Sequence, residues 1–210
     1  MDTQLELVLF ILDKMVRYSE KENYVTRDSD PNEWREHANG LLITHYQELI
    51  KGDVIDFGCN HGACTFLLCE NKNVNKVYGL DLNQNAIDVA NKTKIKFSDY
   101  NVDFICDNVL NFNSDIKFDT IVSFHTIEHI YPDDISIILQ KFYNLLNDGC
   151  YFITSIPYEK GYDNGIQHVA YYNEISLKEL FENNGFETIE CLYDNRVGIP
   201  NILTGVFKKK

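Results

Sequence analysis

The chain has 210 residues, of which 44% are apolar, and a formal net charge of −13. This length is enough to bury one sizeable hydrophobic core and too short for two ordinary domains. A surface with this charge repels phosphate backbones and anionic lipids, so composition disfavours a long nucleic acid as a partner.

The first part of the chain, residues 1–50, is expected to form an N-terminal helical or lid segment. Apolar positions between Leu5 and Tyr18 have the period of an amphipathic helix, and the polar stretch from Ser19 to Asn39 predicts a loop or short turns. The apolar run from Leu7 to Leu12 is too short to span a bilayer, and the N-terminus lacks the basic start of a signal peptide. We therefore expect a cytoplasmic protein without a membrane span.

Residues 51–210 alternate between short strand-like runs and helical patterns, which predicts one α/β domain. The strand-like runs are Val54–Phe57, Lys76–Leu80, Val102–Cys106, Thr120–Phe124, Tyr151–Ile156, Phe186–Tyr193 and Ile202–Phe207. Helical patterns cover Ala63–Glu70, Gln84–Lys94 and Ile135–Asn147, the last with Gly149 as its C′ glycine, and a capping box at Ser176–Glu179 opens another helix. This alternation favours a doubly wound, mostly parallel seven-stranded sheet with helices on both faces.

Acidic residues follow the first three predicted strands. The loop Asp56-Phe57-Gly58-Cys59-Asn60-His61-Gly62 closes the first strand, Asp81 follows the second, and Asp107 follows the third. Ligands of such sheets bind at the carboxyl ends of the strands. Three carboxylates there repel a pyrophosphate and favour a ligand with ammonium and sulfonium charges, such as S-adenosylmethionine, over NAD or ATP.

At this point the sequence resembles the class I S-adenosylmethionine-dependent methyltransferases, over residues 54–186. The resemblance is carried by Val54-Ile55-Asp56-Phe57-Gly58-Cys59-Asn60-His61-Gly62, Val77-Tyr78-Gly79-Leu80-Asp81, Phe118-Asp119-Thr120-Ile121-Val122-Ser123 and Leu146-Asn147-Asp148-Gly149. It implies a Rossmann-like fold in which Gly58 and its neighbours contact the methionine part of the donor, Asp81 the ribose, and Asp107 with Asn108 the adenine. The expected donor contacts are Asp56, Gly58, Cys59, Asn60, Gly62, Asp81, Leu82, Asp107, Asn108 and His125. Asn60 replaces a glycine of the family, and asparagine tolerates the left-handed conformation well.

Candidate catalytic residues follow the fourth strand, in His125-Thr126-Ile127-Glu128-His129, and a further histidine, His168, follows the fifth. His125, Glu128 and His129 are spaced to share one side of a helical turn. Methyl transfer requires alignment of the acceptor and removal of its proton. We expect His129 to act as the general base, oriented by Glu128, with His125 and His168 as the other candidates.

Other interpretations of these residues remain open. His125, Glu128, His129 and His168 could hold a divalent metal that lowers the acceptor's pKa. Such a site resembles that of the small-RNA 3′-terminal ribose methyltransferases, whose two glutamates and two histidines are matched here except at His125. Alternatively, the Glu-His pair is a structural element that shapes the pocket. Our assignment includes no metal ligand.

The function predicted from these observations is S-adenosylmethionine-dependent methylation of a small polar acceptor. Oxygen is the favoured acceptor atom, in a sugar, a lipid precursor or a quinone-like metabolite. One alternative is a metal-dependent 2′-O-methyltransferase acting on the 3′-terminal ribose of an RNA. The alternative from a different class is a regulator that binds the donor but has no catalytic activity.

Overall fold

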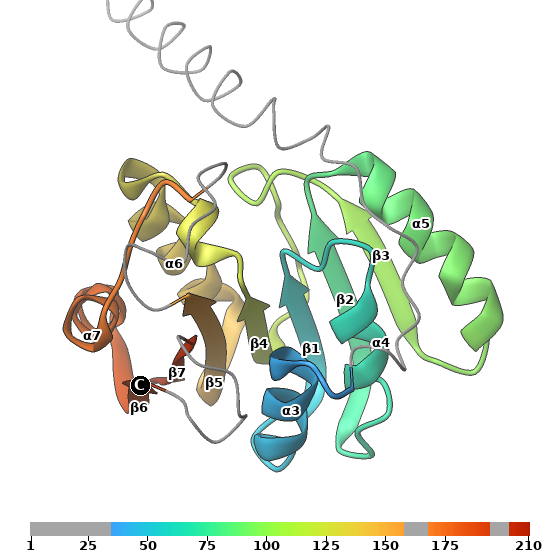
Figure 1. The fold of residues 1–210 in the computed structure, drawn as a ribbon, viewed down its shortest axis with the longest axis horizontal. Coiled ribbons are helices and arrows are strands. Elements are labelled where there is room, and N and C mark those ends of the chain that lie inside the picture. The colour runs from blue at the N-terminus through green and yellow to red at the C-terminus, as the bar shows by residue number, and fades with distance from the viewer. Residues whose placement is uncertain (1–34, 158–167, 194–201) are drawn as a thin grey trace, which may run out of the picture.

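The computed structural model describes residues 35–157, 168–193 and 202–210; the predicted helix over residues 5–18 lies outside these ranges. Within them, seven strands form one sheet in the order β3-β2-β1-β4-β5-β7-β6 (Figure 1). The strands are β1 (Gly52–Phe57), β2 (Val74–Asp81), β3 (Val102–Cys106), β4 (Phe118–Phe124), β5 (Leu146–Pro157), β6 (Phe186–Tyr193) and β7 (Ile202–Lys209). Neighbouring strands pair in parallel from β3 to β5, whereas β7 is antiparallel to β5 and β6. The predicted mostly parallel, seven-stranded sheet is confirmed.

Helices cover both faces of this sheet. They are α3 (Ala38–His45), α4 (Ala63–Leu68), α5 (Gln84–Lys94), α6 (Pro132–Leu145) and α7 (Glu174–Asn183), with short 3₁₀ turns η2 (Ile95–Phe97) and η3 (Ile127–His129). Because successive strand residues point to opposite faces, Val54 belongs to the same buried cluster as Phe66 of α4, and Ile55 to the cluster that contains Phe142 of α6 and Phe181 of α7. None of the helices in the described ranges is long and apolar enough to cross a membrane.

The boundaries of α6 differ from those expected. The helix begins at Pro132, whose ring suits the first helical position, and ends at Leu145. Leu146 adopts an extended conformation (φ −80°, ψ 140°) and starts β5 directly. Gly149, with φ 75°, therefore lies within the range of β5, and its expected role as the C′ glycine of the helix is wrong.

The start of α7 also differs from the expected one. The N-cap is Asn173, whose side-chain oxygen accepts a 2.9 Å hydrogen bond from the backbone N–H of Ser176. The Ser176 hydroxyl in turn accepts a 2.9 Å hydrogen bond from the backbone N–H of Asn173. Ser176 is therefore the last residue of a capping box, at position N3, and not its first, as the sequence pattern suggested.

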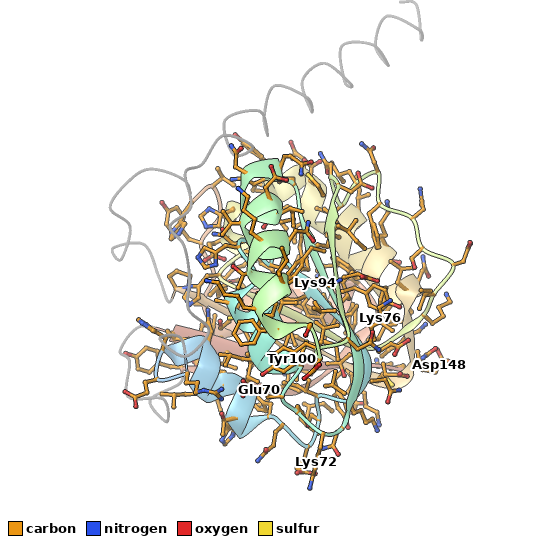
Figure 2. The ribbon with its side chains drawn as sticks, turned by 90° about the vertical axis from the view of Figure 1, so that its right-hand side faces the viewer. Glu70, Lys72, Lys76, Lys94, Tyr100 and Asp148 are labelled. Carbon is orange, nitrogen blue, oxygen red and sulfur yellow. The ribbon has the colours of Figure 1, made fainter. Side chains whose placement is uncertain are left out.

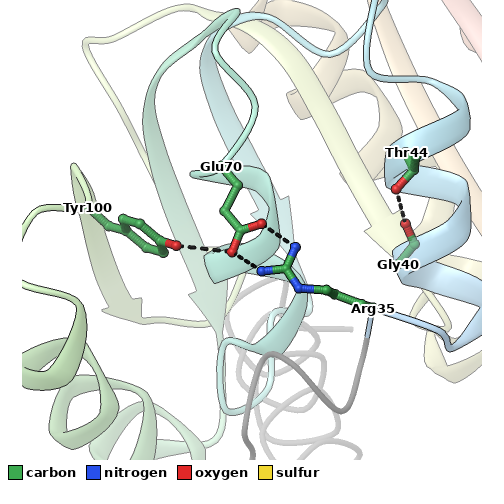
Figure 3. Close-up of polar contacts among 5 residues, drawn as sticks. All are labelled: Arg35, Gly40, Thr44, Glu70 and Tyr100. Carbon is green, nitrogen blue, oxygen red and sulfur yellow. Dashed lines mark hydrogen bonds and ion pairs between the residues drawn. The ribbon is translucent and has the colours of Figure 1, made fainter.

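Part of the predicted N-terminal segment packs into the domain. Leu42 of α3 and Ile50 are fully buried against the sheet. Just before α3, the Arg35 guanidinium pairs with both carboxylate oxygens of Glu70, and the Tyr100 hydroxyl donates a 3.0 Å hydrogen bond to the same carboxylate (Figure 3). Residues 35–50 are thus attached to the residues that follow α4 and to the sheet.

A charged residue of the edge strand β3, Asp103, pairs with lysines of the neighbouring elements β2 and α5. Asp103 forms ion pairs with Lys76 at 2.6 Å and with Lys94 at 3.1 Å; both lysines are labelled in Figure 2. Charged side chains on an edge strand oppose its pairing with a strand of another chain. Beyond that, exposed ion pairs of this kind contribute little to stability.

Candidate functional site

Two cavities lie at the carboxyl ends of the parallel strands. The first, of about 330 Å³, is lined by residues that follow β1, β2, β3 and β4. The second, of about 310 Å³, lies between the start of α3, the end of β1 and the start of α4. Gly58, Asn60 and His125 line both cavities, so these three residues form the boundary between them.

The loop after β1 depends on left-handed backbone conformations. Gly58, Asn60 and Gly62 have φ values of 78°, 49° and 87°. A Cβ atom at Gly58 would lie 2.2 Å from the Thr126 hydroxyl oxygen, and one at Gly62 would lie 2.7 Å from the Phe104 ring. Gly62 thus permits close packing behind the loop and lies outside both cavity linings, although it was expected to contact the donor.

The first cavity contains the expected donor contacts Asp81, Leu82, Asp107 and Asn108. The two Asp81 carboxylate oxygens accept hydrogen bonds of 2.8 Å from the backbone N–H groups of Asn60 and Asn83. Burial raises the pKa of Asp81, and these backbone donors oppose the rise. An ionised carboxylate has about four acceptor positions, so Asp81 retains capacity for further hydrogen bonds.

A lysine from α6 holds the loop that contains Asp107 and Asn108. The Lys141 ammonium donates hydrogen bonds to the carbonyl oxygens of Leu110 at 2.7 Å and Phe112 at 2.8 Å. Burial lowers the pKa of Lys141, while the Asp107 carboxylate opposes this change. The first cavity is therefore bordered by a loop that is fixed to α6.

The second cavity contains the other two expected donor contacts, Asp56 and Cys59. Asp56 is buried, and its Oδ2 accepts a 2.6 Å hydrogen bond from the Thr65 hydroxyl. Burial raises the pKa of Asp56 to about 7; the Thr65 hydrogen bond opposes the rise and the nearby Asp81 charge adds to it. The three predicted aspartates thus line two adjoining cavities and not a single cleft.

His125 has an unusual backbone and a carboxylate neighbour. Its φ is 52°, its backbone N–H donates a 2.8 Å hydrogen bond to the Ser155 carbonyl, and its Nδ1 lies 3.6 Å from Glu128 Oε1. The helical turn includes only residues 127–129, so His125 precedes it. The expectation that His125 shares one helical turn with Glu128 and His129 is therefore wrong.

The remaining candidate residues meet beside this turn. His129 lines the first cavity, and its ring centroid lies 4.8 Å from that of His168 in an edge-on arrangement. Glu128 is only 2% exposed, and its backbone carbonyl accepts hydrogen bonds from the N–H groups of Val169 and Ala170. The structure thus brings His125, Glu128, His129 and His168 together. The ion-pair contact described above joins Glu128 to His125, whereas Glu128 was expected to orient His129.

Three residues of the site were not expected from the sequence. Thr126 fills the space next to Gly58, Asn83 lines the first cavity and caps α5, and Asn39 of α3 lines the second cavity. An asparagine before a helical pattern is a cap signal, so Asn83 could have been identified. Thr126 and Asn39 depend on contacts between distant segments, which no local pattern reveals.

The sequence matches a known domain family and several known proteins. A family model described as methyltransferase domain matches residues 32–191. A carboxy-S-adenosyl-L-methionine synthase of Campylobacter lari is 29% identical over 169 residues, which cover 77% of this chain and 66% of that protein. An uncharacterized methyltransferase of Bacillus mycoides is 26% identical over 172 residues, covering 69% and 77% of the two chains. The chain thus spans slightly less than two thirds of the first of these relatives.

Solved structures share the fold. An S-adenosylmethionine-dependent methyltransferase from Clostridium acetobutylicum aligns with a TM-score of 0.66 at 17% identity and covers 99% of both chains. Magnesium protoporphyrin IX methyltransferase from Synechocystis, solved with bound SAH, aligns with a TM-score of 0.64 at 16% identity and covers 98% of this chain and 99% of that one. At these identities the similarity shows a shared fold and nothing further about this chain.

Proposed function

Because the chain belongs to the methyltransferase domain family, with S-adenosylmethionine as its methyl donor, we propose that it methylates an oxygen of a small polar acceptor. One observation carries the proposal: His125 and His129 line the same cavity as Asp81 and Asp107. Groups able to activate an acceptor therefore face groups suited to a cationic nucleoside.

The linings of the two cavities support a placement of the donor. We propose that its adenosine part occupies the first cavity, with Asp81 accepting from the ribose hydroxyls and Asp107 and Asn108 near the adenine. The amino-acid end lies in the second cavity near Asp56, and the sulfonium lies near Gly58, which lines both cavities. The presence of Gly58 in both linings supports this placement, because a glycine backbone can approach a ligand closely.

The reaction needs few groups from the protein. A bond forms between the acceptor oxygen and the methyl carbon while the carbon–sulfur bond breaks, and sulfur keeps the electron pair. The products are the methylated acceptor, S-adenosylhomocysteine and the proton of the acceptor hydroxyl. A hydroxyl is a poor nucleophile while it keeps this proton, so the protein must make the proton easier to remove.

The cluster of His125, Glu128, His129 and His168 is suited to this task. His129 could remove the acceptor proton directly, or a cation held by the cluster could lower the pKa of the acceptor hydroxyl. A chelator should abolish activity in the second case and not in the first. The net charge of −13 supports a small acceptor over a long nucleic acid, since phosphate contacts usually need basic side chains.

The donor is tested first, by calorimetry of the purified chain with S-adenosylmethionine, S-adenosylhomocysteine, NAD and ATP. We expect binding of the first two and none of the others. A panel of sugars, phenols, quinols and lipid precursors is then screened for release of S-adenosylhomocysteine, with amines included as the competing acceptor class. Tight NAD binding contradicts the proposed donor site. Turnover of amines alone contradicts oxygen as the acceptor atom.

A further inference from the structure

Three side chains beside the first cavity have the spacing of a cation site. The carboxylate of Glu128 and one ring nitrogen each of His129 and His168 lie within 4.8 Å of one another. These residues come from two segments far apart in the sequence, the turn η3 and the residues that lead to α7. Small side-chain movements can therefore direct three ligand atoms at one point.

Glu128 is a buried acid in this cluster. It is 2% exposed, and within the described part of the chain neither of its carboxylate oxygens has a hydrogen-bond partner. The nearest ionisable nitrogen, His125 Nδ1, is 3.6 Å from Oε1, which is too far for a good hydrogen bond. Burial of a carboxylate without a partner is costly, so this oxygen pair is suited to a bound positive charge.

The backbone holds the two histidine-bearing segments together. The N–H groups of Val169 and Ala170 donate to the Glu128 carbonyl oxygen at 2.9 and 3.1 Å. This contact fixes the residue next to His168 against the residue next to His129, and their rings meet edge-on with centroids 4.8 Å apart. A site built on such a fixed frame loses little entropy when it binds a ligand.

We propose that Glu128, His129 and His168 bind one divalent transition-metal cation, with zinc as the first candidate. Imidazole nitrogens suit such metals, and two histidines with one carboxylate form a known type of catalytic zinc site with an open position. His125 stays outside the ligand set and interacts with the carboxylate from the side. The inference deepens the proposed function and rests on it in one respect: the open position serves the acceptor hydroxyl, whose pKa the cation lowers.

The test measures cation binding directly, without donor turnover. The full chain is stripped with a chelator and titrated by calorimetry with zinc, manganese and cobalt chlorides, and the cobalt form is examined by visible absorption. We expect one cation per chain and cobalt absorption bands that depend on Glu128. The variants Glu128→Gln, His129→Ala and His168→Ala should each lose about tenfold or more in affinity.

His125→Ala is the matched control, because it removes a histidine side chain that lies beside the same carboxylate but precedes the turn η3. We expect it to keep cation affinity within about threefold. The inference is overturned if the stripped chain takes up none of the three cations, if Glu128→Gln binds as tightly as the unsubstituted chain, or if His125→Ala loses as much affinity as His129→Ala.

Titration of the same samples with S-adenosylmethionine separates the two proposals and reports on folding. Normal donor binding without cation binding overturns the cation site and leaves the proposed donor site intact. Cation binding without donor binding supports the cation site and contradicts the proposed function. A variant that loses the cation but keeps its donor affinity is folded, so its loss supports the assigned ligand.

Discussion

The backbone N–H of Asn60 donates a 2.8 Å hydrogen bond to the Asp81 carboxylate. This bond joins the loop after β1 to the end of β2, and it holds Asn60 in its left-handed conformation beside Gly58. A single carboxylate therefore shapes the loop and faces the first cavity, so its substitution should affect the bound donor in two ways.

Asp81→Asn should weaken S-adenosylmethionine binding by about 1.5–3 kcal/mol, because one amide oxygen replaces two charged acceptors. Calorimetry measures the change. Asp103→Asn is the matched control: it lies on the neighbouring strand and loses only surface ion pairs with Lys76 and Lys94, so donor affinity should not change. Equal losses in both variants would contradict the role given to Asp81.

Gly58→Ala should abolish measurable donor binding and destabilise the fold by about 1–3 kcal/mol. Its Cβ would be 2.2 Å from the Thr126 hydroxyl, in a backbone conformation that L residues rarely adopt. Gly149→Ala separates strain from steric overlap, because Gly149 also has a positive φ but a new Cβ there would lie 3.9 Å from the Lys208 side chain, at ordinary van der Waals distance. Thermal unfolding and calorimetry are compared for both; intact donor binding in Gly58→Ala would refute the steric argument.

Asp56 should give the folded protein a distinctive pH dependence. Its folded pKa of about 7 lies above the reference value of 3.8, so the folded state binds this proton more tightly. The stabilisation from Asp56 is present below pH 3.8 and is lost as pH rises to about 7. Denaturant unfolding of Asp56→Asn across this range should lack that decline relative to the unsubstituted chain. Parallel profiles for the two proteins would show that Asp56 titrates normally.

Lys141→Met should loosen the loop that follows β3. The substitution removes the hydrogen bonds to the Leu110 and Phe112 carbonyls, so the free energy of unfolding should fall by about 1–3 kcal/mol. The affinity for adenosine-containing ligands should fall as well. Lys178→Met is the control, since Lys178 is exposed and forms only a long ion pair, of 3.9 Å, with Glu182 of the same helix, α7. Similar effects of both substitutions would indicate a general loss of charge.

The mostly parallel sheet and the residues at its strand ends could be predicted from local patterns. Short apolar runs that alternate with helical patterns and the glycine-containing loop after Phe57 are local signals, and parallel pairing then places Asp81 and Asp107 at one edge of the sheet. The pattern also allowed Ser176 to start α7. Asn173 caps it instead, because its side-chain oxygen reaches the Ser176 N–H. Which of two nearby polar residues caps a helix depends on the backbone conformation before the helix, which the sequence pattern does not give.

The arrangement of the histidines could not be predicted, because it depends on backbone geometry after β4. A regular helical turn would have placed His125 on the same side as His129. The positive φ of His125 ends that regularity, and the contact of Glu128 with Val169 depends on two segments that meet only in the folded chain. Spacing along the sequence identified the residues of the cluster but not their contacts.

Thr126, which lines the first cavity, fills the space that a side chain at Gly58 would need, and Gly58 lines both cavities. A bulkier residue at either position would need a smaller one at the other, so the shapes of the two cavities cannot be changed independently at this point. A variant designed to have a larger first cavity should therefore keep Thr126 and change Ile130 or Ile138, which also line this cavity.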